Sequence, residues 1–216
     1  MTATCDYAGT MTRPASPRFE RLIAALPDAV TSAVFISIWM YPFALGDSAI
    51  RNAMLIMLVE FILVHASGFL GGVVLADHVT RSKRVMTLLT FAMFYLVFIG
   101  AFMIVFREGW PLAAFGWLVL GKFAGVIGRP RSARQRARMT AGWTLGAMFY
   151  LGGVFATVFL PVPRLGIGTD AAAQLGLAGS GLWVDEPHRV IAFGAIYFAL
   201  SAWSKWGDWL VGADRP

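Results

Sequence analysis

The residues best suited to chemistry, Glu60 and His65, lie in one apolar segment whose sequence from residue 59 to 69 is VEFILVHASGF. A carboxyl group inside a membrane helix costs roughly 2.5–3.5 kcal/mol on insertion scales, so it usually faces protein or water. Carboxyl and imidazole groups can bind a cation or exchange protons. The segment therefore predicts a ligand or proton site formed by Glu60, His65 and Ser67.

Helical geometry relates these residues to one another. At about 100° per residue, Glu60, Ser67 and Gly71 fall within roughly 20° of one line along the helix, and His65 lies about 140° from Glu60. Glu60 and His65 are five residues apart, so they do not form an i,i+4 pair. Each is expected to meet water or a polar group of another helix. The candidate partners are Thr31, Ser32, Ser37, Tyr95, Thr144, Tyr150, Thr157, Tyr197 and Ser201.

Composition determines what kind of element carries this segment. Hydrophobic residues make up 58% of the 216 residues and charged residues 14%, with a mean hydropathy of +0.67. Soluble domains have about 45–50% apolar and about 25% charged residues. These values exclude a soluble enzyme, a disordered chain and a nucleic-acid-binding domain, and they predict an integral membrane protein.

Six segments approach the length of about 20 residues that a helix needs to cross about 30 Å of hydrocarbon. We therefore expect an all-α polytopic membrane protein, a bundle of six transmembrane helices between an N-terminal tail (1–27) and a C-terminal tail (207–216), with a long outer loop at 161–187. The expected spans are 28–45, 52–76, 85–106, 110–127, 140–160 and 188–206.

The distribution of basic residues predicts the orientation of these spans. Of the 18 Lys and Arg residues, 14 fall in the tails and in alternate connections, and four lie on the other side. Because Lys and Arg accumulate in cytoplasmic loops, both termini are expected in the cytoplasm. The predicted location is the bacterial inner membrane, crossed by several passes.

The Glu-Phe-x-x-x-His-x-Ser-Gly-Phe run from Glu60 to Phe69, together with six spans in about 200 residues, resembles bacterial integral membrane families of unknown function. The resemblance covers most of the chain by topology and ten residues by motif. It implies a six-span membrane protein and supplies no activity.

Glycines four residues apart suggest how the spans pack. Small residues let helix backbones approach closely in lipid, where no hydrophobic effect drives association. We expect the second, fourth and fifth spans to be packing elements and the third to face lipid, although the same motifs could mediate a homo-oligomer. The glycines are Gly68, Gly72, Gly121, Gly125, Gly142 and Gly146.

A strongly basic stretch follows the fourth span. Against anionic lipid headgroups, each positive charge contributes about 1 kcal/mol. We expect this stretch to contact such headgroups on the cytoplasmic side. Alternatively, it could bind a partner in a larger membrane complex. We do not expect it to bind nucleic acid. The residues are Arg129, Arg131, Arg134, Arg136 and Arg138.

The chain lacks the patterns of membrane enzymes, and we predict no catalytic residues, metal or cofactor. It has no HExxH motif and no phosphate-binding Gly-Lys-Ser/Thr motif. His65 and His78 are about 20 Å apart on one helix, too far to share a haem. Asp185, Glu186 and His188 could ligate a cation, but an acidic pair also suits the start of a helix.

Two functions stay open. The favoured one is a small channel or transporter with a polar site at Glu60 and His65, and the alternative is a structural or accessory subunit of a membrane complex. A water-accessible cavity that reaches Glu60 would favour the first. Dry packing around a Glu60 kept protonated by desolvation would favour the second.

Overall fold

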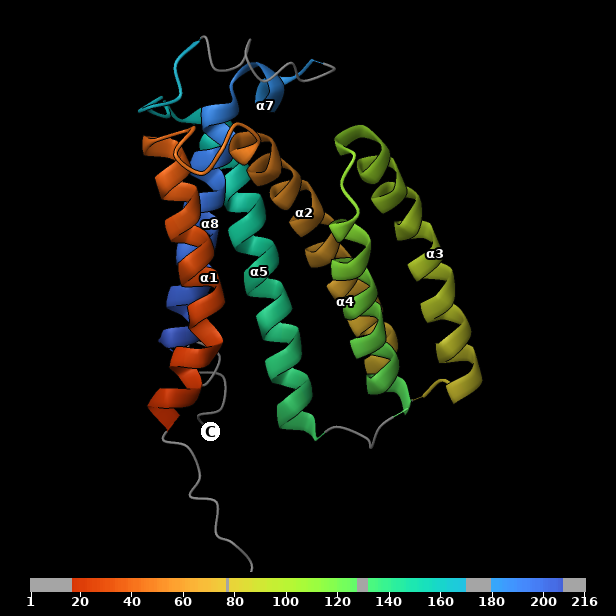
Figure 1. Ribbon diagram of the computed structural model, residues 1–216. Coiled ribbons are helices and arrows are strands. Elements are labelled where there is room, and N and C mark those ends of the chain that lie inside the picture. Colours follow the sequence, from red (N-terminus) through yellow and green to blue (C-terminus); the bar gives the residue numbers. More distant parts are fainter. Residues whose placement is uncertain (1–16, 77, 128–131, 170–179, 208–216) are drawn as a thin grey trace, which may run out of the picture.

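The computed structural model describes residues 17–76, 78–127, 132–169 and 180–207 (Figure 1). Every regular element in these ranges is a helix, which confirms the all-α prediction. The helices are α1 (Pro17–Met40), α2 (Ala49–Leu75), α3 (Arg81–Phe106), α4 (Trp110–Ile127), α5 (Ala133–Phe159), α7 (Leu182–Asp185) and α8 (Pro187–Trp206).

Four helices in the described residues are long and apolar enough to cross a membrane, and they indicate a membrane protein. They contain the segments Arg21–Met40, Ala49–Leu75, Arg81–Phe106 and Gln135–Phe159. The apolar part of α4, Trp110–Ala124, is shorter. α8 is not among the four because His188, Arg189 and Lys205 lower the hydropathy at its ends.

The first helix differs most from the boundaries predicted by sequence. α1 begins at Pro17 rather than at residue 28, continues through Pro27 and ends at Met40 rather than at residue 45. The expected tail of 1–27 is thus helical from residue 17, and residues 1–16 lie outside the described residues. Proline removes one backbone donor from a helix. The helix nevertheless continues through it, and beyond it α1 packs along α8, whose last turn lies at the Asp28–Lys205 ion pair.

The other ends differ less. α2, α3 and α5 begin three to seven residues before the predicted spans, because their polar first turns are helical as well. At α5, unlike α2 and α3, a side-chain cap stabilises the early start. The Ser132 hydroxyl accepts a hydrogen bond from the Gln135 amide, and the Gln135 side chain accepts one from the Ser132 amide. This reciprocal pair satisfies helix donors that water would otherwise have to satisfy.

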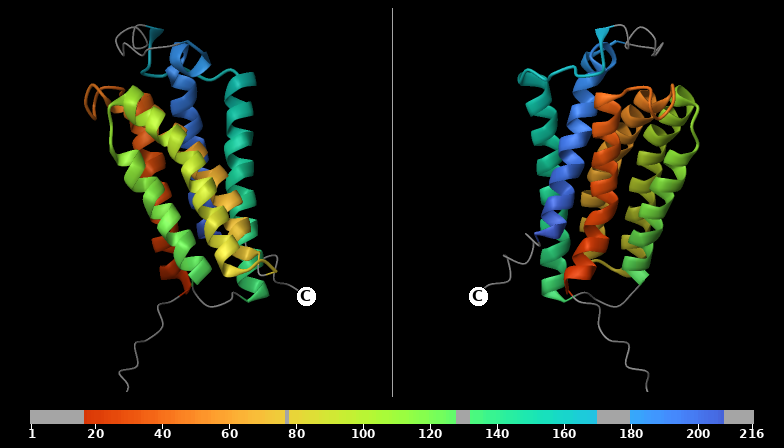
Figure 2. Two further views of the ribbon diagram at one scale, coloured as in Figure 1. Left: turned by 90° about the vertical axis from the view of Figure 1, so that its right-hand side faces the viewer. Right: turned by 60° about the vertical axis from the view of Figure 1, so that its left-hand side comes forward.

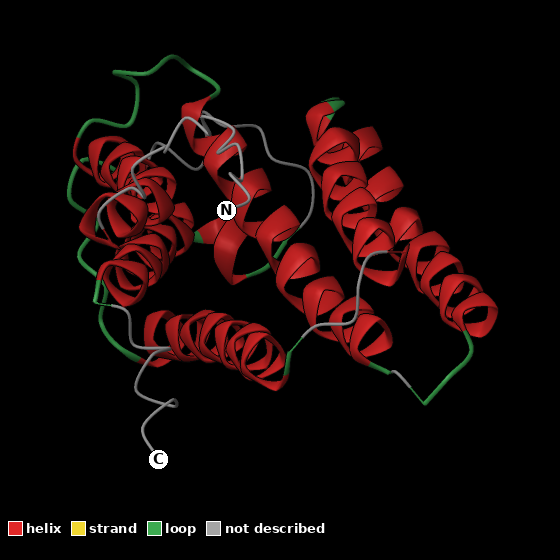
Figure 3. Cartoon of the chain, turned by 90° about the horizontal axis from the view of Figure 1, so that it is seen from below, coloured by secondary structure: helices red, strands yellow, loops and turns green. Residues whose placement is uncertain are grey.

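α2 lies between two groups of helices (Figures 1 and 2). On one side α3 and α4 pack on each other and on α2; on the other, α1 and α8 pair along their length and α5 packs on α8 and α2. Figure 3 shows this arrangement from below, end-on to the helices. The first and last helices of the chain are thus neighbours.

Each group has its own hydrophobic core, and α2 contributes to both. One core joins α1, α2, α5 and α8 around Phe35, Tyr150 and Phe193. The other joins α2, α3 and α4 around Leu70 and Phe115. About half of the α2 segment is buried, against about a tenth of the α5 segment. The most buried helices are therefore α2, which is the second expected span, and α8; the glycine motifs suggested the second span but not the last, and α5, the fifth span, is mostly exposed.

Candidate functional site

A cavity of about 730 Å³ lies along α2, between α4 and α5. On α2 it extends from Glu60 to Leu75, which is about 22 Å at 1.5 Å per residue. α4 lines it with Trp117, Leu118 and Lys122; α5 with Arg138, Trp143 and Phe149; α8 with Tyr197 and Lys205. We call the end where α4 and α8 finish and α5 begins the basic end.

Glycine creates much of this space. Gly71 and Gly72 of α2 and Gly142 and Gly146 of α5 all line the cavity. A Cβ atom added at Gly72 or Gly146 would meet no atom within 4 Å. The space between α2 and α5 at these positions is therefore left by the absent side chains of the glycines, and no other side chain fills it.

Glu60 is at the end of the cavity that lies deepest in the bundle. Its Oε1 accepts a hydrogen bond of 2.6 Å from the hydroxyl of Tyr197. The Tyr197 ring meets Tyr150 edge to face, with centroids 5.5 Å apart, and Tyr150 donates to the Met57 carbonyl at 2.8 Å. These rings belong to the core of α1, α2, α5 and α8, which closes the cavity beyond Glu60.

An ion pair lies on the same wall, nearer the basic end. Lys205 of α8 and Asp28 of α1 are 2.5 Å apart, and both line the cavity. Ser201 and Ser204 complete the α8 face between this pair and Tyr197. Polar groups thus follow one side of α8 from the basic end to Glu60.

Lys122 supplies a positive charge from the opposite wall. Its ammonium group donates to the backbone carbonyl of Ser67 at 3.2 Å, and a Cβ added at Gly71 would lie 3.6 Å from its nitrogen. Arg138 of α5 lines the cavity near the basic end. The cavity therefore has a carboxyl group at its deep end and basic groups toward its mouth.

Of the three residues predicted to form the site, Glu60 and Ser67 line this cavity and His65 does not. The Nδ1 atom of His65 donates to the Phe61 carbonyl at 2.8 Å, and its ring lies 4.1 Å from the Phe61 ring, centroid to centroid. The rotation of about 140° between positions 60 and 65 explains this separation. Among the predicted polar partners of Glu60, Tyr197 makes the hydrogen bond.

The predicted packing glycines behave differently from one another. At Gly68 an added Cβ would lie 2.1 Å from the Trp143 ring, whose Nε1 donates to the Val64 carbonyl at 2.9 Å. Gly121, like Gly72 and Gly146, has open space at that position. The surroundings of Gly125 lie outside the description. Two glycines outside the motifs, Gly153 and Gly194, receive the rings of Phe193 and Phe35.

Basic side chains at the basic end cap helices. Arg136 donates to the Leu75 carbonyl, Arg84 to the Val74 carbonyl and Arg81 to the Ile127 carbonyl, at 3.2–3.4 Å. Cations are favourable at the C-terminal ends of helices because the last carbonyls lack intrahelical donors. Arg136 was expected to contact lipid headgroups. Of the other positions in that prediction, Arg138 lines the cavity, and Arg129, Arg131 and the side chain of Arg134 lie outside the described residues.

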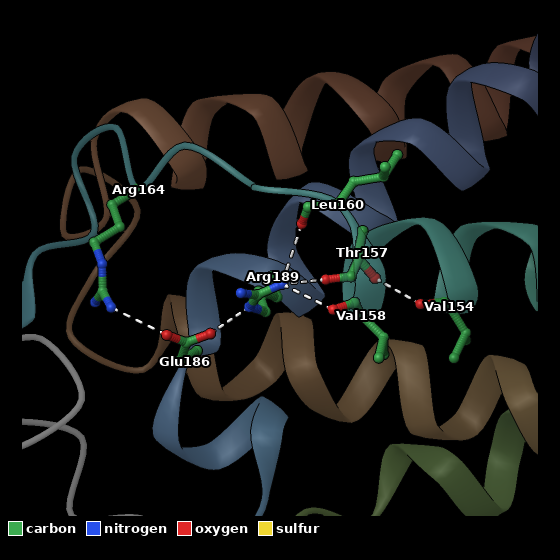
Figure 4. Close-up of polar contacts among 7 residues, drawn as sticks. All are labelled: Val154, Thr157, Val158, Leu160, Arg164, Glu186 and Arg189. Atoms are coloured by element: carbon green, nitrogen blue, oxygen red, sulfur yellow. Dashed lines mark hydrogen bonds and ion pairs between the residues drawn. The ribbon is translucent and has the colours of Figure 1, made fainter.

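The opposite end of the bundle is closed by a different network (Figure 4). Arg189 of α8 donates to the Thr157 carbonyl at 2.6 Å and to the Leu160 carbonyl at 3.3 Å, which caps α5. It also pairs with Glu186, which accepts a second bond from Arg164 at 3.2 Å. The hydrogen bond from Arg189 lowers the pKa of Glu186 below its usual value.

The segment after α5 folds back over this end. The Trp39 indole donates to the Pro163 carbonyl at 2.9 Å, and the Gly166 amide donates to the Trp39 carbonyl at 3.1 Å. A Cβ at Gly166 would lie 2.2 Å from the Met40 carbonyl oxygen, so this position requires glycine. Ile167 is fully buried in the core below. Access to Glu60 from this end is therefore blocked by packed side chains.

The described residues contain no cluster suited to a metal ion: no three His, Cys, Asp or Glu side chains come together. Asp185 accepts a hydrogen bond from the Gly181 amide at 3.3 Å within its own turn, and His188 is buried. The sequence alone did not associate Asp28, Lys122, Arg138 and Lys205 with Glu60. They come from four helices, and no spacing relates them.

Comparisons of the chain with protein-family models, with curated proteins and with solved structures found no match. The candidate site therefore rests on the cavity alone. It is a largely apolar space with the Glu60 carboxyl and the Tyr197 hydroxyl bonded to it at the closed end, and with basic groups toward the open end.

Proposed function

We propose that this chain is a six-span protein of the bacterial inner membrane that binds a small solute or ion at Glu60 and carries it across the membrane. The observation that carries the proposal is that Glu60 lines the wall of a cavity instead of being enclosed by packed side chains. A carboxyl with a purely structural role would need dry packing and satisfied oxygens. The accessory-subunit alternative lacks that support.

The proposed topology adds α4 and α8 to the four long apolar helices. With 18 and 20 residues they are about 27 and 30 Å long, which suits a bilayer core. The first helix begins and the last helix ends at the basic end, which we place in the cytoplasm by the 14-to-4 distribution of Lys and Arg. Reporter fusions at Lys83 and at the C-terminus should then be cytoplasmic, and fusions at Gly46 and Gly168 periplasmic. A periplasmic C-terminus would contradict the six-span topology.

The proposed working state is open to the cytoplasm and closed to the other side. Transporters bind near the middle of the membrane and expose that site alternately to either face. Here the deep end of the cavity is at Glu60, and the core of α1, α2, α5 and α8 separates it from the far face. Transport would require α5 or the α1–α8 pair to move.

The test compares wild type with Glu60→Gln in liposomes, by flux of protons and monovalent cations and by infrared titration of the carboxyl band. Gln keeps the shape and hydrogen bonding but cannot ionise. We expect a titrating band and flux in wild type, and a loss of flux of about tenfold or more in the variant, where tenfold corresponds to about 1.4 kcal/mol. Asp47→Asn, an exposed carboxylate outside the cavity, is the control. Equal flux in both proteins, with no titrating band assigned to Glu60, would make the site structural.

A further inference from the structure

The cavity opens toward the hydrocarbon of the bilayer as well as toward the basic end. Trp117 of α4 lines the cavity and yet is 81% exposed, and Trp143 of α5, on the facing wall, is 41% exposed. The opening therefore lies between α4 and α5. Trp117 is seven residues from the start of α4, about 10 Å along the axis, so the opening is at membrane depth. A molecule dissolved in the bilayer could enter there without passing through water.

The walls beside this opening are apolar and aromatic. Trp117 and Leu118 of α4 and Trp143 and Phe149 of α5 line the cavity together with Leu63 of α2. Such walls suit a ring-bearing apolar body, and the faces of aromatic rings also attract cations.

Charge separates the two ends of the cavity. Glu60 is at the deep end, and Tyr197 donates to its Oε1. The ammonium of Lys122 is bonded to the Ser67 carbonyl, seven residues or about 10 Å further toward the basic end. Lys205 is paired with Asp28. A ligand that reaches the deep end thus meets a carboxyl group first, where low polarity strengthens attraction to an opposite charge.

We propose that the ligand is an amphipathic organic cation with an aromatic or otherwise apolar body and one positive charge. It enters from the bilayer between α4 and α5, its body lies against Trp117, Trp143 and Phe149, and its charge meets the Glu60 carboxylate. This assignment of a substrate class rests on the transport function proposed above for the same cavity.

The test uses two probes of equal shape and opposite charge, tetraphenylphosphonium and tetraphenylborate, titrated into the full-length protein in nanodiscs by calorimetry and by tryptophan fluorescence. We expect the phosphonium to bind at least tenfold more tightly than the borate. Glu60→Gln should weaken the phosphonium at least tenfold and leave the borate unchanged or tighter. Asp47→Asn should alter neither affinity.

A second variant makes the test independent of how Glu60→Gln folds. Trp117→Ala removes an exposed ring from the cavity wall and leaves Glu60 intact, and it should weaken phosphonium binding several-fold. The comparison of the two probes on wild type needs no variant, provided that the binding of each probe to protein-free nanodiscs of the same lipid is subtracted, because the membrane dipole potential favours the anion in lipid.

The outcomes separate this inference from the proposed function. If the borate binds as tightly as the phosphonium or more tightly, Lys122 and Arg138 select the ligand, and the inference is overturned. If neither probe binds while ion flux still depends on Glu60, the inference fails and the transport function stands. If neither probe binds, no carboxyl titrates and flux does not depend on Glu60, both fail.

Discussion

The two halves of α5 both carry glycine, but one half is closed and the other is open. Near the opposite end, a Cβ at Gly153 would lie 2.5 Å from the fully buried ring of Phe193. Seven residues nearer the basic end, at the middle of α5, a Cβ at Gly146 would meet no atom within 4 Å, and the space beside it belongs to the cavity. A glycine on a helix face marks close packing only where a large side chain of a neighbouring helix fills the space it leaves.

The largest expected effect comes from a large side chain at Gly153, where the Phe193 ring already fills the space beside the glycine. Gly153→Leu would force its side chain into the Phe193 ring, which has no room to move because it is fully buried. Overpacking of a core typically costs 1–3 kcal/mol, and we expect about 3 kcal/mol here. Thermal unfolding in detergent, followed by circular dichroism, should show a clearly lower melting temperature. Unchanged melting would mean that α5 and α8 do not pack as described.

The matched substitution on the same helix sharpens the comparison. Gly146→Leu places its side chain in the cavity, so we expect normal melting and a loss of phosphonium binding of about tenfold, or about 1.4 kcal/mol. The sequence motif alone predicts instead that Gly146 lies in a close contact between helices or protomers, where leucine would destabilise the bundle or block an oligomer. Gly121→Leu, also with open space but not on the cavity wall, is the control for added bulk. If Gly146→Leu melts early and still binds the probe, the glycine serves packing.

A smaller effect is expected at the network that closes the opposite end. Arg189→Gln removes the cation that caps α5 and should cost about 1 kcal/mol, within the range for a partly buried charge at a helix C-terminus. Ser204→Ala, a hydroxyl substitution on α8 away from this network, should have little effect by the same melting assay. Equal melting of Arg189→Gln and wild type would show that the carbonyls of α5 need no cation.

The same network should make the stability of the protein depend on pH in the acidic range. The pKa of Glu186 is lowered in the folded protein, chiefly by its hydrogen bond from Arg189. The carboxylate therefore contributes stability above its unfolded pKa, and this contribution is lost as the pH falls below about 4.5 and through the folded value. Melting between pH 3 and 6 should show this loss in wild type and a smaller one in Arg189→Gln. If wild type and Arg189→Gln show identical melting curves over this pH range, the ion pair of Glu186 with Arg189 does not stabilise the folded protein.

The folded structure separated residues that the sequence placed together. Glu60, His65 and Ser67 share a short run, yet only Glu60 and Ser67 line the cavity. Helical rotation already distinguished His65, but which side of α2 would be open depends on where α4 and α5 pack. Glu60 and its partner Tyr197 are 137 residues apart, and nine polar residues were equally eligible. No local pattern could choose among them.

What the sequence by itself determined is what depends on neighbours along the chain. Composition and apolar lengths predict helices suited to a bilayer, because hydrocarbon requires backbone polar groups to be bonded within each helix. Glu60 is recognisable from the sequence as a candidate site residue, because an ionisable group in the middle of such a helix is costly to bury. Only the tertiary structure decided three features: the pairing of α1 with α8, the open space beside Gly146, and the contact of the Phe193 ring with Gly153. Packing between helices depends on which side chains meet across the interface, and those side chains come from distant parts of the chain.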